Sequence, residues 1–182
     1  MSLSLPGYQS PAASTEVPLE MLAACHGRIE AQCASLRRLV QHLPFHGADE
    51  PARQAAVAVM RYFDIAAPQH HEDEEVDLFP ALIESMAGSD AVCLRELTES
   101  LARDHRVLEA AWRVLRRMLE GVARGDAAAL DAGRAEEFAR ACEQHLARED
   151  AELLPMAARL LDDAALSRIG VAMRVRRGIA SK

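Results

Sequence analysis

The sequence repeats one pattern, and this repeat limits the folds that the chain can adopt. Residues 70–80 read HHEDEEVDLFP, and residues 145–155 read HLAREDAELLP, with the same spacing of histidine, glutamate, leucine and proline. A repeat of this kind indicates that one structural unit is present twice. We therefore predict two copies of one helical hairpin. The positions that coincide are His70 with His145, Glu74 with Glu149, Leu78 with Leu153, and Pro80 with Pro155.

A second pair of segments also repeats, and each of its members precedes one of the segments above. HGRIEAQCASLRR begins at His26, and HRVLEAAWRVLRR begins at His105. When the two histidines are aligned, Glu30 coincides with Glu109. One histidine therefore falls on each of four segments, in the same register within the two copies.

The spacing of apolar residues is helical along the chain, as at Leu97, Leu101 and Leu108. Alanine, leucine, glutamate and arginine, which are good helix formers, dominate the composition. No run of alternating valine, isoleucine and threonine suggests a strand. We predict an all-α fold, an antiparallel up-and-down four-helix bundle with a short fifth helix at its C-terminal end.

Proline, glycine and capping residues set the expected helix boundaries. The first helix should stop before Pro44, and Asp49 should cap the second. Pro68, Pro80 and Pro155 fall inside helices, which they should kink or locally unwind because proline lacks a backbone N–H. The expected helices cover about residues 15–42, 49–85, 89–121, 126–160 and 163–174.

The chain of 182 residues suits one domain with one core. We expect a flexible segment at 1–14, the bundle at 15–160, and a short helix with a basic tail at 161–182. The basic stretch MRVRRGIASK at 173–182 is predicted to be a solvated tail. Because the net charge is −7, a nucleic-acid-binding surface is not expected. No pattern indicates an oligomeric state.

The expected location is the cytoplasm. The first residues lack the basic and apolar regions of a signal peptide, and no apolar run has the length of a membrane span. The cysteines are widely spaced without a CxxC motif, so we expect free thiols, mostly buried, in a reducing compartment. They are Cys25, Cys33, Cys93 and Cys142.

The spacing of the repeated residues places their side chains on one helix face. His70 and Glu74 are four residues apart, and so are His145 and Glu149, so each pair projects together. An aromatic residue lies seven positions before each of these histidines, on roughly the same face. A solvated face would not need a large aromatic side chain, whereas an inward face built around a metal would. These aromatic residues are Phe63 and Phe138.

A single histidine on a helix is ordinarily a surface or core residue, but the duplicated set favours a metal site. Imidazole and carboxylate ligands together suit iron, manganese or zinc. Four imidazoles, two bridging glutamates and an oxo or hydroxo bridge fill most positions of two octahedral ions and leave about two open. The predicted ligands are His26, His70, Glu74, His105, His145 and Glu149.

Three further residues are weaker candidates for ligands. His71 is rotated about 100° from His70 on a helix, so both should not point the same way, and the repeat favours His70. Glu30 and Glu109 each lie one turn past a ligand histidine. Either could fill an open position, accept a hydrogen bond from a neighbouring histidine, or pair with arginine.

These residues resemble the hemerythrin-like family, the bacterial HHE cation-binding domain, over about residues 15–160. The resemblance implies a four-helix up-and-down bundle with a non-haem di-iron centre between the helices. The oxygen-carrying members have a histidine where this chain has Glu109, and a longer-spaced aspartate where this chain has Glu149. The chain is therefore more similar to bacterial members proposed to act in oxygen or nitric-oxide sensing, iron handling or repair.

Three hypotheses follow. The first is a di-iron protein that binds or senses dioxygen, peroxide or nitric oxide, or handles iron, with Phe63, Phe138 and Trp112 keeping its pocket dry. The second is a di-iron enzyme of the peroxidase type or of the type that repairs nitrosative or oxidative damage, with Glu30 or Glu109 as a proton donor. The third is a structural or adaptor bundle that holds zinc or no metal.

Overall fold

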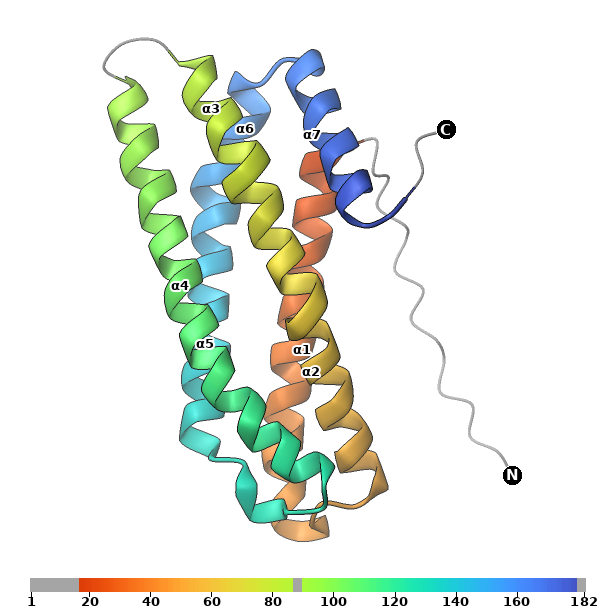
Figure 1. Cartoon of the computed structure of the whole chain (residues 1–182). Coiled ribbons are helices and arrows are strands. Elements are labelled where there is room, and N and C mark those ends of the chain that lie inside the picture. Colours follow the sequence, from red (N-terminus) through yellow and green to blue (C-terminus); the bar gives the residue numbers. More distant parts are fainter. Residues whose placement is uncertain (1–16, 87–89, 180–182) are drawn as a thin grey trace.

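The structure, a computed structural model, describes residues 17–86 and 90–179, and its regular secondary structure there is entirely helical (Figure 1). The predicted all-α class is therefore confirmed, while segment 1–14 lies outside the described residues. The elements are α1 (Pro18–His46), α2 (Glu50–Glu72), a π-helical segment (Asp73–Leu78), α3 (Phe79–Ser85), α4 (Asp90–Ala123), a 3₁₀ turn (Ala127–Ala129), α5 (Ala132–Arg148), a second π-helical segment (Glu149–Leu153), α6 (Leu154–Leu160) and α7 (Asp163–Arg176).

The long helices lie side by side and form a bundle (Figure 1). Helix α2 continues through the first π-helical segment into α3, and α5 continues through the second into α6. Helix α1 packs against α2 and α5, and α4 packs against the same two helices. Helix α7 lies outside this arrangement and packs on α1 and on the first π-helical segment.

Two helix boundaries differ from the sequence prediction. Helix α1 does not stop before Pro44 but continues to His46, where Gly47 adopts φ 67° and donates its N–H to the Leu43 carbonyl at 2.9 Å. The fourth long helix, α5, begins after Asp131 and not at Asp126. Asp126 instead caps the short 3₁₀ turn, by accepting the N–H of Ala128.

Asp49 caps α2 as predicted, because its side chain accepts the backbone N–H of Ala52 at 3.0 Å. Pro68 lies within α2, whereas Pro80 and Pro155 each follow a π-helical segment. The wider π turns are local departures from the α-helix, so the expected unwinding is confirmed at these two prolines. The departure occurs at the same place in both copies of the repeat.

The core consists of two apolar clusters separated by a polar layer. In α1, Leu22 belongs to one cluster and Ile29 to the other, with His26 between them. In α4, Leu101 and Leu108 flank His105 in the same way. The histidines of α2 and α5 occupy equivalent places, so apolar packing encloses the polar layer on both sides.

Residues 173–179, the described part of the basic C-terminal stretch, are not the solvated tail that the sequence suggested, while residues 180–182 lie outside the described residues. Arg176 and Arg177 both pair with Asp73, a fully buried carboxylate in the first π-helical segment. Arg176 also contacts Asp77 at 2.7 Å and Glu72 at 3.1 Å. Helix α7 packs its apolar face beside the first π-helical segment, which is rich in carboxylates. A buried carboxylate such as Asp73 requires compensating positive charge, and the two arginines provide it.

We predict that Arg177→Ala will lower the free energy of unfolding by about 2–3 kcal/mol, because it removes a charged partner from the buried Asp73 carboxylate. Denaturant unfolding followed by circular dichroism measures this change. Arg168→Ala, an exposed position in the same helix, is the matched control and should change stability by less than about 0.5 kcal/mol. Equal effects of the two substitutions would contradict the role assigned to Arg177.

Candidate metal centre

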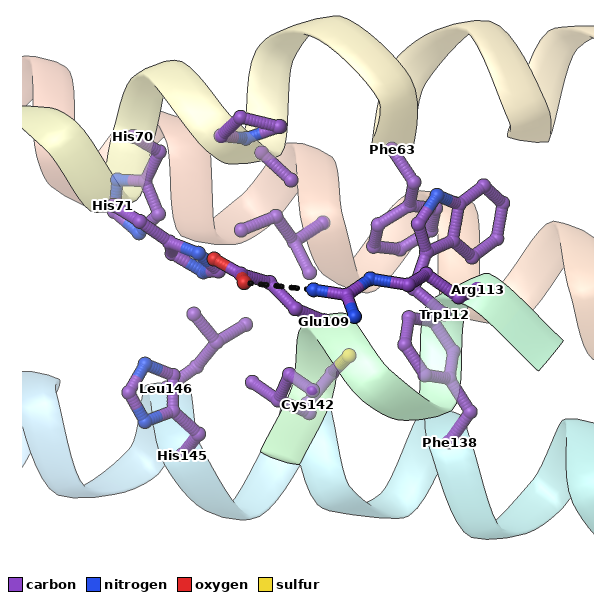
Figure 2. A pocket seen from close by; sticks show the side chains of 14 residues that line it. Phe63, His70, His71, Glu109, Trp112, Arg113, Phe138, Cys142, His145 and Leu146 are labelled. Atoms are coloured by element: carbon purple, nitrogen blue, oxygen red, sulfur yellow. Dashed lines mark ion pairs between the residues drawn. The ribbon is translucent and has the colours of Figure 1, made fainter. Parts of the chain in front are cut away.

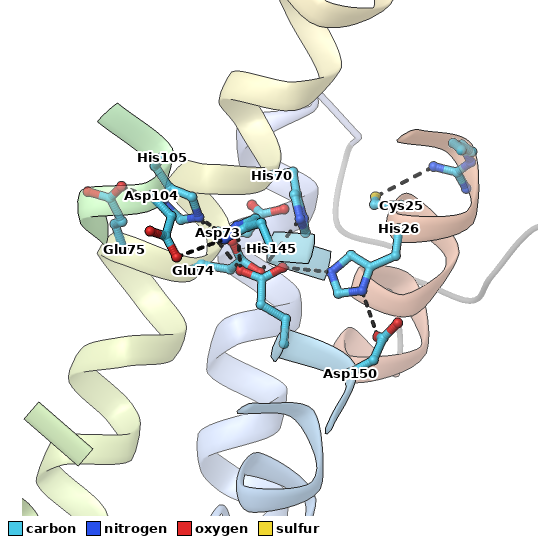
Figure 3. A network of polar contacts seen from close by, with 12 residues as sticks. Cys25, His26, His70, Asp73, Glu74, Glu75, Asp104, His105, His145 and Asp150 are labelled. Atoms are coloured by element: carbon cyan, nitrogen blue, oxygen red, sulfur yellow. Dashed lines mark hydrogen bonds and ion pairs between the residues drawn. The ribbon is translucent and has the colours of Figure 1, made fainter. Parts of the chain in front are cut away.

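The predicted ligands converge within the polar layer. Figure 2 shows His70 and His71 of α2 opposite His145 of α5, and Figure 3 shows His26 and His105 approaching from the other two helices. Each of the six predicted ligands is at least 96% buried, with exposed fractions of 2% for His26, 1% for His70, 0% for Glu74, 0% for His105, 4% for His145 and 0% for Glu149.

These side chains form two overlapping groups, each compact enough to surround one cation. The ligand atoms within a group lie within 4.8 Å of one another. Both groups contain Glu74 and Glu149, which therefore lie between the two positions. We refer to the groups as the first and second subsite. The first subsite is His26, His70, Glu74 and Glu149, and the second is His105, His145, Glu74 and Glu149.

His71 also reaches the centre, although we expected only one of the two adjacent histidines to do so. It groups with His105 and His145, while His70 groups with His26. The His71 ring stacks on His105 with the centroids 3.9 Å apart. The rotation between neighbouring residues on a helix thus points the two imidazoles toward different histidines of the centre, and His71 groups with His105 and His145 but with neither glutamate.

Two carboxylates that the sequence analysis missed hold the ligand histidines. Asp150 Oδ1 lies 2.7 Å from His26 Nδ1, and Glu75 Oε1 lies 2.7 Å from His105 Nδ1. An imidazole that donates from Nδ1 presents its Nε2 lone pair to the centre, an arrangement usual for metal-bound histidine. The sequence repeat could have identified these two carboxylates, because Glu75 and Asp150 each directly follow a repeated glutamate and therefore occupy equivalent positions.

The third such contact is looser. Asp104 Oδ2 lies 3.7 Å from His145 Nδ1, and the same oxygen accepts a hydrogen bond from Arg148 Nη1 at 2.7 Å. Asp104 therefore orients His145 less tightly than Asp150 and Glu75 orient their histidines.

The burial of two carboxylates close together shifts the pKa values of the ionisable groups at the centre. Burial, together with the Glu149 charge, raises the pKa of Glu74 well above its usual range. Burial also acts to raise the pKa of Glu149, but contacts with His105 and His145 outweigh it and lower that pKa. Burial opposes protonation of His105, yet its contacts with Glu149 and Glu74 raise its pKa to about 10. A cation bound at this centre would take the place of protons as the positive partner of the two carboxylates.

The donor atoms fit a cation. Within residues 17–86 and 90–179, both oxygens of Glu74 and of Glu149 are buried without a well-aligned hydrogen bond, although His145 Nε2 lies 2.9 Å from Glu149 Oε1 and His105 Nε2 lies 3.4 Å from Glu74 Oε2. Buried polar atoms are normally paired, so a set of unpaired acceptors facing one another indicates a missing positive partner. Imidazole and carboxylate donors suit iron, manganese or zinc.

The remaining candidates lie away from the donor groups. Glu30 is exposed, and the structure does not bring it into either subsite. Glu109 is half-buried and pairs with Arg106 at 3.5 Å and with Arg113 at 3.6 Å. Of the roles considered from the sequence, pairing with arginine is the one that the structure shows for Glu109.

The aromatic residues, one each from α2, α4 and α5, form one cluster beside the centre. The Phe63 ring lies 4.9 Å from Trp112 and 5.0 Å from Phe138, measured between centroids. Trp112 donates its indole N–H to Asp64 at 3.0 Å, which fixes the ring. All three side chains are at least 91% buried.

Comparison with known proteins agrees with this geometry. The sequence model of the hemerythrin HHE cation-binding domain matches residues 17–157. The chain belongs to this family. It is also 31% identical over 162 residues to an uncharacterized protein of Haemophilus influenzae, with 89% of this chain and 91% of the relative covered. The family resemblance inferred from the residues is confirmed, and the clustered histidines and glutamates of this hemerythrin-like chain support cation binding.

Two further expectations can be compared with the structure. The cysteines are unpaired, and Cys25, Cys33 and Cys142 are buried while Cys93 is exposed. Across the described ranges, the helices lack the long, nearly uncharged apolar stretch that crossing a bilayer requires.

We predict that Asp150→Asn and Glu75→Gln will each weaken metal binding about 10–100-fold, because each loosens the orientation of one histidine. Competition with a chromophoric chelator measures the affinity for ferrous iron or zinc. Glu152→Gln, an exposed carboxylate in the second π-helical segment, serves as the control and should bind as the wild type does. Wild-type affinity in both test variants would show that these carboxylates do not position the ligands.

Proposed function

We propose that the protein holds two iron ions and uses them to bind or sense a small oxidant. The observation that carries this proposal is the pair of subsites that share Glu74 and Glu149. In this assignment the two glutamates bridge the ions. His26 and His70 serve the first ion, and His71, His105 and His145 serve the second. An iron pair with an open position supplies redox chemistry toward dioxygen, peroxide or nitric oxide.

Iron is favoured by the ligand set and by the family. Imidazoles outnumber carboxylates in the two subsites, whereas ferritin-like di-iron oxidases use carboxylate-rich sites. Manganese and zinc accept the same donors and are the alternative ions. An oxo or hydroxo group would complete the bridge. We infer an antiparallel up-and-down bundle around this centre, and we propose a cytoplasmic location in keeping with the unpaired cysteines.

The unequal subsites suggest where a small ligand binds. The first subsite would bring four protein residues to its ion, and the second would bring five if His71, which groups with His105 and His145, also binds there. The first ion therefore has more positions open. The protein's contribution is to hold these donors in an enclosed layer from which bulk water is largely excluded, with Phe63 and Trp112 on one side.

A role in sensing is supported by the contacts of α7. Arg176 and Arg177 bind Asp73, the residue immediately before the proposed bridging Glu74. A change in the position of Glu74 would therefore act directly on the anchor of α7. This connection provides a route from the centre to the surface of the protein.

The test is to purify the protein without oxygen, load it with ferrous iron, and record visible absorption before and after admitting air. We expect a charge-transfer band on oxygenation, and reversal of this band on degassing would favour binding over turnover. His105→Leu should abolish the band, whereas Glu30→Gln, outside both subsites, should retain it. A colourless wild-type protein that retains only zinc or no metal would contradict the proposal.

A further inference from the structure

A cavity of about 300 Å³ adjoins the proposed metal centre. The imidazoles of His70, His71 and His145 line one end, and Phe63, Trp112 and Phe138 line the other. Figure 2 shows these two sets of rings facing each other across the space. The cavity therefore connects the donor atoms of the centre with an aromatic wall.

Most of the cavity wall is apolar. Between the imidazoles and the aromatic rings it is completed by aliphatic side chains, among them Ile29, Leu108 and Leu146. The three aromatic rings pack against one another, with centroids 4.9–5.7 Å apart. A preformed wall of this kind favours apolar ligands, because binding them requires little rearrangement of the protein.

The charged residues of the cavity lie on its exposed side. Glu109 and Arg113 pair at 3.6 Å, and their side chains are 38% and 72% exposed. Figure 2 shows this pair between the imidazoles and the aromatic rings. Because the two charges compensate each other, the cavity offers no unpaired charge for an ionic ligand. Away from the metal centre, the cavity wall therefore favours a neutral ligand over a carboxylate or an ammonium compound.

The volume exceeds the requirement of a diatomic molecule. A cavity of about 150 Å³ lined by apolar side chains is sufficient to bind benzene. The space next to the centre is about twice that size. Dioxygen or nitric oxide would leave most of it unfilled, whereas a molecule of one or two rings would contact both ends.

We propose that this cavity binds a compact, uncharged organic molecule of one or two rings, with the rings against the aromatic wall and any polar end toward the imidazoles. Binding itself requires only the cavity. The placement of such a molecule beside a metal ion rests on the proposed function. The proposal extends the class of ligands at this centre from diatomic molecules and peroxide to small organic compounds.

Trp112 provides a direct test, because it is the chain's only tryptophan and it lines the cavity. Iodobenzene quenches tryptophan fluorescence on contact through its heavy atom. We expect saturable quenching in the zinc-loaded protein, with reversal by an excess of toluene. Iodide should quench weakly, because Trp112 is only 9% exposed. Quenching that rises linearly without saturation, or that toluene does not reverse, would overturn the proposal.

A matched pair of substitutions locates the binding. Ala67 lines the cavity, whereas its neighbour Ala66 does not. Ala67→Leu should weaken iodobenzene binding at least tenfold by filling the space, and Ala66→Leu adds the same atoms elsewhere and should leave binding unchanged. Leu108→Ala should admit the larger 1-iodonaphthalene more readily, which tests the same point if Ala67→Leu does not fold. Equal affinities in all variants would place binding outside the cavity.

Iron uptake, measured on a metal-free preparation of the same protein reconstituted without zinc, separates the two proposals. Saturable quenching in a protein that takes up no iron would uphold the cavity proposal and contradict the di-iron function. A protein that takes up iron but shows no saturable quenching would uphold the function and overturn the cavity proposal.

Discussion

The structure depends on the burial of two carboxylates, Glu74 and Glu149, between two apolar clusters. Such burial is costly unless positive charge or hydrogen-bond donors compensate it. The surrounding imidazoles supply part of this compensation, and a cation between the carboxylate oxygens would supply the rest. Metal binding and stability of the bundle should therefore be linked, because a cation that binds only the folded chain stabilises it.

The two copies of the repeat build the centre by crossing over. Glu75 of the first copy holds His105 of the second, and Asp150 of the second copy holds His26 of the first. Glu74 and Glu149, one from each copy, both belong to both subsites. Neither hairpin has a complete subsite by itself, so the polar layer also fixes how the two hairpins pack together.

The two copies of the repeat differ at two positions beside the centre. His71 has Leu146 as its counterpart, so one subsite gains an imidazole and the cavity gains an apolar wall. Asp73 has Arg148 as its counterpart, and only the first copy attaches α7 through a buried carboxylate. A nearly symmetric centre thus has two different sides, one next to the apolar cavity and one next to helix α7.

Much of this arrangement could be predicted from the sequence. The repeat and the helical spacing gave the fold class and brought together the six residues from His26 to Glu149 that converge in the structure. The place of His71 could not be predicted. Its rotation of about 100° from His70 on the helix shows only that the two imidazoles point in different directions, and not what His71 contacts. The pairing of Arg177 with Asp73 joins residues 104 positions apart, and no local pattern signals such a contact.

The number of metal ions bound per chain tests the central claim most directly. We expect the protein, purified and reconstituted without oxygen, to bind two iron ions per chain, and we expect Glu74→Ala to lose tight binding of both because the two subsites share this carboxylate. Circular dichroism confirms that the variant is folded. A wild-type chain that binds one ion or none, or a folded Glu74→Ala variant that keeps both ions, would contradict a shared pair.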